Sequence, residues 1–372
     1  MQAALRRLEP YRGRRVVVAM SGGVDSAVAA HLMAQAGAEV VGLAMRLHDP
    51  DPHNPLAPRA CCPPDDLQDA RRVAEHIGAP FYVMDARASF DRNVVRPFVD
   101  AYLKGTTPNP CVGCNAFVKL ERLDKRARDL GAVALVTGHY ARVEDGRLFA
   151  GYDGQKDQSY FLFSVPSEVL RSMVCPLGSL TKEQVRRLAL EAGLPVAHKL
   201  ESQEVCFVGG GGAGRFVMRQ PEAQGSHDGE IVDEAGRVVG RHSGIMNFTI
   251  GQRRGIGVAA RRKLHVLKLE PETRRVVVGE EGRLDCAGLT AERASWPSGV
   301  APAERFRAVV QIRYRDPGTE ALVVPLGSSQ VEVRFHRPVR AIAPGQAVVF
   351  RRGEEVLGGA WITRSFEQVP SP

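Results

Sequence analysis

RVVVAM at residues 15–20, followed directly by SGGVDS at residues 21–26, decides the fold. The first half is a short β-branched run, which is typical of a buried strand. Beyond the glycines, Val24, Val28 and Leu32 recur on one helical face, and Gly37 stands where a helix commonly ends. The stretch therefore predicts a strand, a glycine loop and a helix in direct succession.

The same alternation of strand and helix continues downstream. Strand-like runs at residues 40–45, 81–84 and 133–137 are separated by helical patterns at residues 67–77 and 120–130. Strands that alternate with helices predict a doubly wound parallel sheet with helices on both faces. Ligands of such sheets bind at the carboxyl ends of the strands, which is where SGGVDS lies.

The pattern changes after about residue 207. A four-glycine run at residues 209–212 predicts a flexible loop. Short β runs separated by glycine, proline and charged turns then follow, at residues 276–278, 306–314, 321–324, 331–335 and 347–350. This pattern is typical of an all-β, barrel-like fold.

The length of 372 residues fits two or three domains. We expect an α/β domain over residues 1–208, a small central β-rich domain over residues 209–278 and a C-terminal β-barrel domain over residues 279–372. A hydrophobic content of 44% and a charged content of 25% are ordinary for a soluble globular protein.

The positive charge is concentrated near the C-terminus. The chain carries a net charge of +8, and residues 251–372 contain 20 Lys+Arg against 13 Asp+Glu, a surplus of 7. A local arginine surplus is the footprint expected of a phosphate-backbone partner. A solvated, arginine-rich surface explains the same composition equally well.

The N-terminus offers neither an apolar signal core nor a cleavage pattern, and no apolar run approaches the ~20 residues that span a bilayer. We therefore expect a cytoplasmic protein with no membrane partner. In that compartment the seven cysteines should be reduced. Close cysteine pairs then point to catalysis or metal binding rather than to structural disulfides.

The SGGVDS loop has the composition of a phosphate-binding site. Its glycines let the backbone turn and present N–H groups, the following helix adds a partial positive charge, and Ser21 and Ser26 add hydroxyl donors. Asp25 is expected to act through Mg²⁺ or to orient the loop. The lysine of a Walker A loop is missing. The alternative is a glycine turn that serves only helix–strand packing.

The loop resembles the SGGxDS loop of the N-type ATP pyrophosphatases, which holds the β,γ-phosphates while ATP is split to AMP and pyrophosphate. The resemblance implies an ATP site formed by Ala19, Met20, Ser21, Gly22, Gly23, Val24, Asp25, Ser26, Met45 and Gly138. The strand position of Met45 fits a core residue equally well.

Three cysteines stand in distinctive contexts. Cys111 and Cys114 form a C-x-x-C pair in TPNPCVGCN, and Cys206 lies in ESQEVCF. Alone, a C-x-x-C pair is half of a zinc site, a redox pair or a set of cluster ligands. Because no second C-x-x-C or H-x₃₋₅-H follows, zinc is disfavoured. Cys175 and Cys286 are expected to pack as small apolar residues. Cys61–Cys62 lie in a Pro-rich loop after a strand, which is compatible with a position next to the site.

Together the motifs resemble a known family. TPNPCVGCN after SGGVDS is similar to the bacterial and mitochondrial tRNA-specific 2-thiouridylases. So are the Cys206 segment and four further motifs in the expected order: TGHY at 137–140, KDQSY at 156–160, FTIGQRRG at 248–255 and QIRY at 311–314. The usual lysine of the third of these is Arg254 here, which keeps the charge. The resemblance spans almost the whole chain and makes residues 1–208 an ATP pyrophosphatase domain.

The resemblance implies roles for the cysteines. Cys114 matches the family nucleophile, and Cys206 matches the cysteine that carries sulfur as a persulfide; the two can also form a disulfide during the cycle. Some family members have Asp at the position of Cys111, so this residue is not the universal thiol. It is expected to line the base pocket, or to join Cys114 and Cys206 as the third ligand of an iron–sulfur cluster.

The resemblance also implies contacts to tRNA or to the reacting base, by Asn109, Pro110, Cys111, His139, Lys156, Asp157, Gln158, Arg313, Tyr314 and Gln346. Read from the residues alone, His139 is a hydrogen-bonded loop histidine, residues 156–158 form a polar turn, and Arg313–Tyr314 belong to an alternating strand face.

The activity implied by the resemblance is ATP-dependent 2-thiolation of the wobble uridine. The C2 oxygen is a poor leaving group until adenylation turns it into AMP, after which a persulfide can attack C2. The expected cofactors are ATP and Mg²⁺, and the expected partners are tRNA and a sulfur donor, either a sulfurtransferase or a cysteine desulfurase. A synthetase that adenylates a small substrate and adds nitrogen, or a non-catalytic nucleotide- or RNA-binding module, would explain the phosphate loop but not the other motifs.

Overall fold

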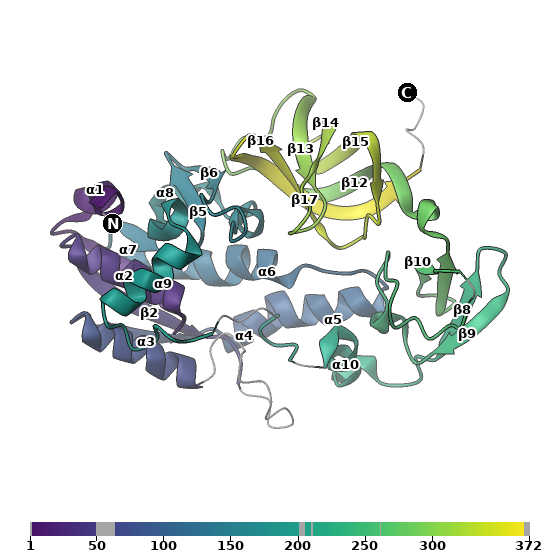
Figure 1. The fold of residues 1–372 in the computed structure, drawn as a ribbon, viewed down its shortest axis with the longest axis horizontal. Helices are drawn as coiled ribbons and strands as arrows, with labels where there is room; N and C mark the ends of the chain where they lie inside the picture. Colours follow the sequence, from purple (N-terminus) through teal and green to yellow (C-terminus); the bar gives the residue numbers. More distant parts are fainter. Residues whose placement is uncertain (1, 50–63, 201–204, 210, 261, 368–372) are drawn as a thin grey trace.

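The computed structural model describes residues 2–49, 64–200, 205–209, 211–260 and 262–367 (Figure 1). Its N-terminal part is built on a five-stranded sheet of order β3-β2-β1-β4-β7, in which every pairing is parallel. The strands are β1 (Arg15–Ala19), β2 (Glu39–Arg46), β3 (Phe81–Asp85), β4 (Ala134–Val136) and β7 (Met173–Val174). The predicted doubly wound parallel sheet is confirmed.

Helices cover both faces of this sheet. Val16 and Val18 of β1 belong to one buried cluster, whereas Val17 between them belongs to another, because successive side chains of a strand point to opposite faces. The first cluster includes residues of α1 (Gln2–Leu8), α2 (Val24–Gln35), α3 (Pro64–His76) and α9 (Lys182–Glu191). The second includes residues of α4 (Arg87–Phe90), α6 (Pro110–Gly113), α7 (Glu121–Asp129) and α8 (Ser167–Ser172).

Two long helical stretches on the second face each contain a π-helical segment. One consists of α4, the π-helix η2 (Asp91–Val95) and α5 (Arg96–Leu103); the other consists of α6, the π-helix η3 (Cys114–Leu120) and α7. They run between the sheet and the rest of the molecule (Figure 1). Single-turn π segments occur frequently at functional sites.

The central part contains a second sheet of order β10-β11-β8-β9. Its strands are β8 (Gly229–Asp233), β9 (Val238–His242), β10 (His265–Glu270) and β11 (Arg275–Gly279). The flexible loop expected over residues 209–212 is wrong at its last glycine, because Gly212 begins a helix, α10 (Gly212–Met218). This helix is ordered by packing, since Phe216 and Val217 join Phe98 in a small hydrophobic cluster.

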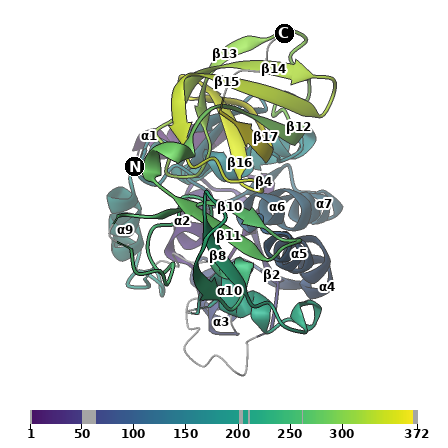
Figure 2. The same ribbon diagram turned by 90° about the vertical axis from the view of Figure 1, so that its right-hand side faces the viewer.

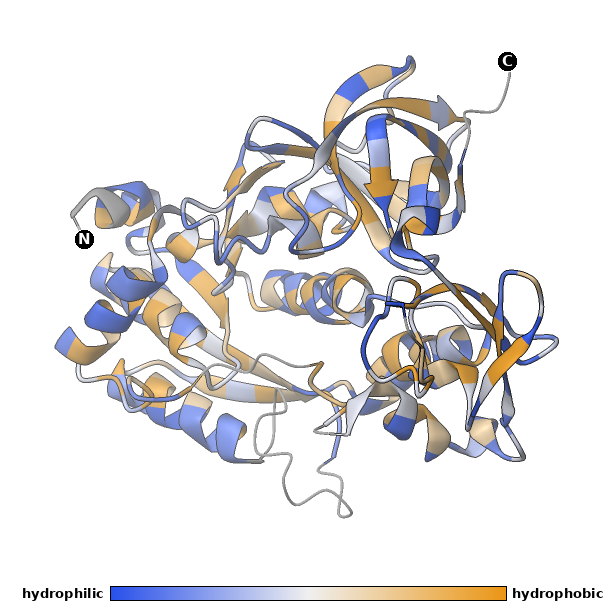
Figure 3. Ribbon diagram, turned by 45° about the vertical axis from the view of Figure 1, so that its right-hand side comes forward, coloured by the Kyte–Doolittle hydropathy of each residue, from blue (hydrophilic) through white to orange (hydrophobic). Residues whose placement is uncertain are grey.

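The C-terminal part is a closed barrel. It comprises β12 (Asp285–Ser295), β13 (Phe306–Gln311), β14 (Thr319–Leu326), β15 (Gln330–Arg340), β16 (Ala347–Arg352) and β17 (Glu355–Phe366). The order β12-β15-β14-β13-β16-β17 is closed by pairing of β12 with β17. Hydrophobic and hydrophilic residues alternate along these strands, as Figure 3 shows. The predicted barrel is confirmed.

The strand expected over residues 306–314 ends at Gln311 instead. The Asp316 side chain accepts hydrogen bonds from the backbone N–H groups of Ile312 (3.0 Å) and Gly318 (3.1 Å), and the Gln311 side chain donates to the Asp316 carbonyl (2.7 Å). These bonds fold residues 312–318 into a turn. Arg313 and Tyr314 therefore lie on a loop and not on a strand face.

A hairpin of the N-terminal part joins the barrel sheet. Strands β5 (Ala141–Glu144) and β6 (Arg147–Ala150) continue the sheet beyond β17, with Leu148 opposite Val356. Figure 2 shows the barrel lying above the α/β part. The boundaries expected at residues 208 and 278 stay predictions, and the β5–β6 hairpin makes the first part continuous with the last. No helix among the described residues combines the length and apolar character needed to cross a membrane.

Candidate active site

The SGGVDS loop connects β1 to the N-terminus of α2. Gly22 has φ +75°, and a Cβ added to it would lie 2.1 Å from the carbonyl oxygen of Asp66, so no other residue fits here. Gly23 precedes the helix with extended backbone, and no side chain caps the helix. The first N–H groups of α2 are thus left for an anionic ligand, as in known phosphate sites.

Hydroxyl groups brace the loop from inside. The backbone N–H of Ser21 donates to Oγ of Ser26 (3.1 Å), and Oγ of Ser26 donates to the carbonyl of Gly23 (3.1 Å). Gly138, at the end of β4, packs against the same turn: a Cβ added there would lie 2.8 Å from the carbonyl carbon of Asp25 and the nitrogen of Ser26. The structure thus brings Gly138 to the loop with which the sequence grouped it.

Asp25 is held by two groups that lie outside the site predicted from the sequence. Nζ of Lys182 lies 2.7 Å from Oδ1 and 2.9 Å from Oδ2 of Asp25, and the Tyr140 hydroxyl donates to Oδ1 (2.8 Å). Lys182 is only 8% exposed. Both carboxylate oxygens are engaged by the protein, which favours the loop-orienting role of Asp25 over direct metal binding.

A second cation lies on the other side of the loop. Nζ of Lys199 donates to the carbonyl of Gly22 (3.0 Å), to Oδ2 of Asp69 (2.6 Å) and to Oδ1 of Asp66. Burial acts to lower the pKa of Lys199, but the hydrogen bonds to Asp66 and Asp69 outweigh it and raise that pKa above its ordinary value. The Lys199 ammonium is charged at neutral pH. Lys182 and Lys199 therefore flank the SGGVDS loop on two sides.

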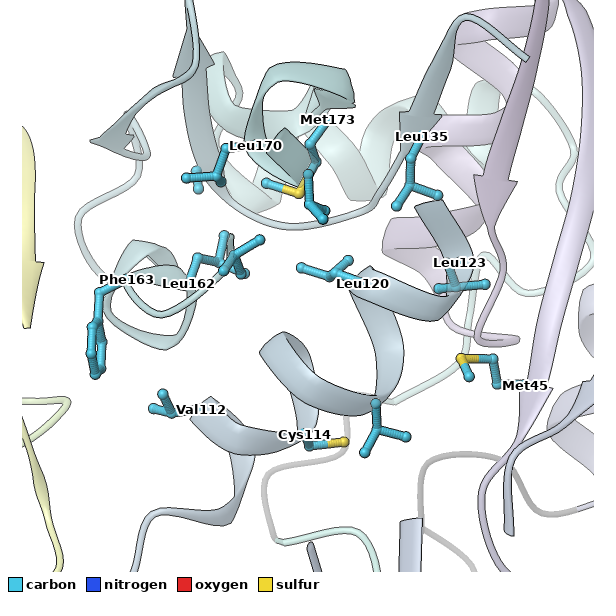
Figure 4. Packing of buried hydrophobic residues seen from close by; sticks show 14 of the residues in the cluster. Met45, Val112, Cys114, Leu120, Leu123, Leu135, Leu162, Phe163, Leu170 and Met173 are labelled. Carbon is cyan, nitrogen blue, oxygen red and sulfur yellow. The ribbon is translucent and has the colours of Figure 1, made fainter. Parts of the chain in front are cut away.

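Cys114 begins the π-helix η3 and is 5% exposed. It belongs to the hydrophobic cluster of the second sheet face, and Figure 4 shows it between Val112 of α6 and Met45 of β2. Cys206, far away in sequence, packs against the same cluster, and Cys111 is exposed on α6. Cys61–Cys62 lie outside the described residues.

The described residues contain no group of three His, Cys, Asp or Glu side chains that could hold a metal ion. Cys111, Cys114 and Cys206 are thus not gathered into a ligand set here, and an iron–sulfur cluster stays a prediction. Cys175 and Cys286 pack against hydrophobic clusters as expected. Burial raises the pKa of the Cys175 thiol to about 11, which keeps it protonated and unreactive at neutral pH.

His139 follows β4 and Gly138 at the carboxyl end of the sheet. Its Nδ1 lies 3.0 Å from Oγ1 of Thr137. Burial, with a smaller contribution from the charge of Lys119, lowers the pKa of His139 to about 4. The imidazole is therefore neutral at pH 7 and is available as a hydrogen-bonding group without a charge.

Several residues expected to contact tRNA already have partners within the protein. The Asp157 carboxylate accepts bonds from Gly151 N (3.0 Å), from the N and Oγ of Ser159 (3.0 and 2.9 Å) and from Nη2 of Arg351 in β16 (2.9 Å). Oε1 of Gln158 accepts from the Tyr140 N–H (3.0 Å). These two side chains connect the hairpin, the barrel and the residue that binds Asp25.

Gln346 has a similar position on the other side of the site. Its Nε2 donates to the carbonyl of Thr107 (2.8 Å), and the Thr107 N–H donates to the carbonyl of Pro344 (2.9 Å). The barrel is thereby fastened to the segment that leads into Asn109, the residue before the first turn of α6.

The remaining predicted RNA contacts are more accessible. Arg313 is exposed and Lys156 is partly exposed. The centroid of the Tyr314 ring lies 4.4 Å from that of the Phe161 ring. Burial raises the pKa of the Tyr314 hydroxyl above its ordinary value. In the central part, Gln252 accepts from the Thr249 N–H (2.9 Å) and shapes the turn that carries Arg253 and Arg254.

Three family models match successive parts of the chain. The tRNA methyl transferase HUP domain matches residues 14–210, the tRNA methyl transferase PRC-barrel domain residues 219–280, and the Aminomethyltransferase beta-barrel domain residues 286–362. The first alone covers more than half of the chain.

Curated relatives match over nearly the full length. The chain is 47% identical to the tRNA-specific 2-thiouridylase MnmA of Geobacter metallireducens, over 94% of this chain and 96% of the relative. It is 45% identical to the protein of that name from Geotalea uraniireducens, over 94% of this chain and 95% of the relative. It is 43% identical to the protein of that name from Carboxydothermus hydrogenoformans, over 94% of this chain and 98% of the relative.

Proposed function

Because the chain belongs to the family of tRNA-specific 2-thiouridylases, we propose that it transfers sulfur to C2 of the wobble uridine of tRNA at the expense of ATP. The observation that carries the proposal is the combination of an uncapped glycine loop at the end of β1 with two cysteines, Cys114 and Cys206, on one cluster of the same sheet. A synthetase that adds nitrogen to a small substrate would have no use for that pair.

The first step activates the uridine. The C2 oxygen attacks the α-phosphorus of ATP as the N3 proton leaves, so an O–P bond forms and pyrophosphate departs. The loop N–H groups, the Ser21 hydroxyl and the ammonium groups of Lys182 and Lys199 would stabilise the charge of the departing pyrophosphate. Mg²⁺ enters with ATP as part of the substrate and neutralises the phosphates. Asp25 fixes the loop and the Lys182 ammonium in place.

The second step replaces oxygen by sulfur. The terminal sulfur of a Cys206 persulfide attacks C2, and the C2–O bond breaks to release AMP. The Cys114 thiolate then attacks Sγ of Cys206, and the electron pair of the broken S–S bond stays on the sulfur at C2. The products are 2-thiouridine, which regains its N3 proton, and a Cys114–Cys206 disulfide. A thiol reductant restores the two thiols, and a protein persulfide recharges Cys206.

A buried nucleophile needs access and a nearby partner. Cys114 is 5% exposed, so the base must enter beside α6, where Cys111 and Asn109 lie at the surface. Reaction at a base requires that it leave the anticodon stack. Exposed basic residues such as Arg313 and the basic last third of the chain would hold the phosphate backbone while the base is in the site.

The proposal is tested with purified protein, unmodified tRNA, Mg·ATP and a protein that carries a persulfide as the sulfur donor, followed by mass analysis of the nucleosides. We expect 2-thiouridine and an equal amount of AMP from the wild type, no thiolated base from Cys206→Ser, and tRNA that stays disulfide-linked to Cys206 in Cys114→Ser. Cys286→Ser in the barrel is the matched control and should retain activity. A methylated uridine, the product suggested by the names of two family models, or no modified base despite tRNA binding, would contradict the proposal.

A further inference from the structure

A cavity of about 410 Å³ lies where the two long helical stretches meet the barrel. One wall is formed by η2 and α5, the second by residues 106–110 and the helix that follows, and the third by barrel residues that include Arg293 and Trp361. Both π-helical segments thus contribute to its lining. The cavity shares Asn109 and Pro110 with the segment expected to contact the reacting base, but none of the cysteines that the structure describes lines it.

The cavity is positively charged. Arg92 of η2 and Arg293 of β12 stand on different walls, and no Asp or Glu is among the lining residues. Neither arginine forms an ion pair within the part of the chain that the structure describes. Two guanidinium groups without a carboxylate, facing one space from separate elements, form a site for an oxyanion such as a phosphodiester.

Arg293 is held in place by its surroundings. Its guanidinium carbon lies 4.4 Å from the centroid of the Trp361 ring, and its backbone has φ +54°, which a non-glycine residue seldom adopts. The β12–β17 pairing shifts its register between Glu292 and Ser295, which flank Arg293. Bulges beside functional sites commonly re-aim a side chain, and strained backbone gathers at such sites.

The cavity also offers a surface for stacking. Phe117 of η3 lines it and is 46% exposed, an unusual position for a large aromatic ring on a helix of the core. Aromatic rings in a basic groove are the usual platform for unstacked bases, and each stacked base contributes about 1–3 kcal/mol. A phosphate-binding pair beside an exposed ring matches the chemistry of a single nucleotide.

The position of the cavity relative to the cysteines decides which nucleotide fits. Pro110, Gly113 and Phe117 follow one another at the spacing of a single helical face, and all three line the cavity. Cys111 and Cys114 are displaced from that face by one residue, on the same turns. A strand that presents one base to the cysteine face can therefore place an adjacent nucleotide in the cavity.

We propose that this cavity binds the nucleotide next to the reacting uridine, with its phosphodiester between Arg92 and Arg293 and its base against Phe117. This inference rests on the proposed function and adds to it a second nucleotide subsite. By fixing the neighbouring nucleotide, the subsite would hold the anticodon strand in the splayed form that puts uridine into the site.

The test combines neutral phosphate linkages with arginine variants. Full-length tRNAs carrying one methylphosphonate at each position of the anticodon loop are bound to wild-type protein and to Arg293→Gly. Glycine suits φ +54°, so this variant keeps the fold while removing the guanidinium. Arg92→Ala tests the opposite wall, and Phe117→Leu tests stacking. Arg7→Ala on α1, at the far end of the molecule (Figure 1), is the control.

We expect a methylphosphonate at one linkage beside the wobble uridine to weaken binding to the wild type about tenfold, as the loss of one charged contact does. Arg293→Gly should bind unmodified tRNA about tenfold more weakly, with no further loss at that linkage and a salt slope smaller by about 0.7–0.9. If the loss of affinity caused by Arg293→Gly multiplied with the loss caused by the methylphosphonate at every position, the subsite would be overturned. Wild-type affinity in both arginine variants would also overturn it. If binding showed that Arg293 and one linkage act together but the wild type made no 2-thiouridine, the proposed function would be contradicted and the subsite would stay supported.

Discussion

Nζ of Lys182 lies 2.7 Å from Oδ1 of Asp25, which joins the first residue of α9 to the SGGVDS loop. A lysine at the first position of a helix faces the positive end of the helix dipole, where a cation is disfavoured. The carboxylate of Asp25 compensates for this, and Thr181 fixes the helix start with a capping box. The ammonium is therefore built into the loop at a place where phosphate charge would develop.

Replacing this ammonium should impair adenylation more than tRNA binding. We expect Lys182→Gln to lower the rate of pyrophosphate release on the order of 10²-fold, as for other groups that stabilise developing charge, with little change in tRNA affinity. Arg187→Gln, on the exposed face of the same helix, serves as the control. A variant that releases pyrophosphate at the wild-type rate would show that Lys182 only balances Asp25.

The glycine loop gives a prediction about shape. Gly22→Ala would place a Cβ 2.1 Å from the Asp66 carbonyl and force a side chain into φ +75°, so the loop must move. We expect ATP binding, followed by calorimetry, to be lost, with a melting temperature lower by several degrees. Gly154→Ala is the matched control, because nothing lies within 4 Å of its Cβ position. Retained ATP affinity in Gly22→Ala would contradict the assignment of the loop.

The barrel is tied to the α/β part by a buried cation. Arg351 is 8% exposed and binds Asp157 (2.9 Å) and Oε1 of Gln311 (2.6 Å). Arg351→Met would leave the largely buried Asp157 carboxylate without its cationic partner, at a cost of about 3–5 kcal/mol. We expect a fall in melting temperature of roughly 10 °C, against little change for exposed Arg352→Met. A small effect of both variants would mean that the contact does not join the two parts.

His139 gives a pH dependence. Its pKa is lowered to about 4 in the folded protein from an ordinary 6.5, so its neutral form stabilises the fold fully above pH 6.5, and this stability is lost as the pH falls toward 4. Unfolding by urea at pH 7 and pH 5 should show that His139→Gln loses less stability on acidification than the wild type does, by up to about 1.4 kcal/mol per pH unit. Equal losses in both proteins would mean that His139 is protonated without cost in the folded state.

Much of the fold follows from local pattern. The alternation of buried strands with helical faces indicates the parallel sheet, and the evenly spaced β runs indicate the barrel. The β5–β6 hairpin had a readable signal, since Asp145 and Gly146 both take positive φ at its turn, as hairpin turns with Asp-Gly do. The pairing of this hairpin with β17 depends on tertiary contacts, so it could not be predicted from the local sequence.

The site was predictable where chemistry is carried by contiguous residues. SGGVDS and the cysteine motifs stand out because glycines and thiols have few other uses in such contexts. Lys182 and Lys199 did not, because a lysine looks the same whether it points into solvent or reaches a loop that is distant in sequence. Lys182 offered a faint signal, a cation directly after a helix cap, whereas the partners of Asp157 and Gln346 emerge only when the barrel docks.

The central claim is that Cys206 carries the sulfur and Cys114 releases it. The most direct measurement is a single turnover with protein charged with one labelled persulfide sulfur, unmodified tRNA and Mg·ATP, with no other sulfur source. We predict that the label moves to 2-thiouridine in step with a Cys114–Cys206 disulfide, and that Cys114→Ser stalls with tRNA disulfide-linked to Cys206. Label that reaches the base at the wild-type rate in Cys206→Ser, or without the disulfide, would contradict the account.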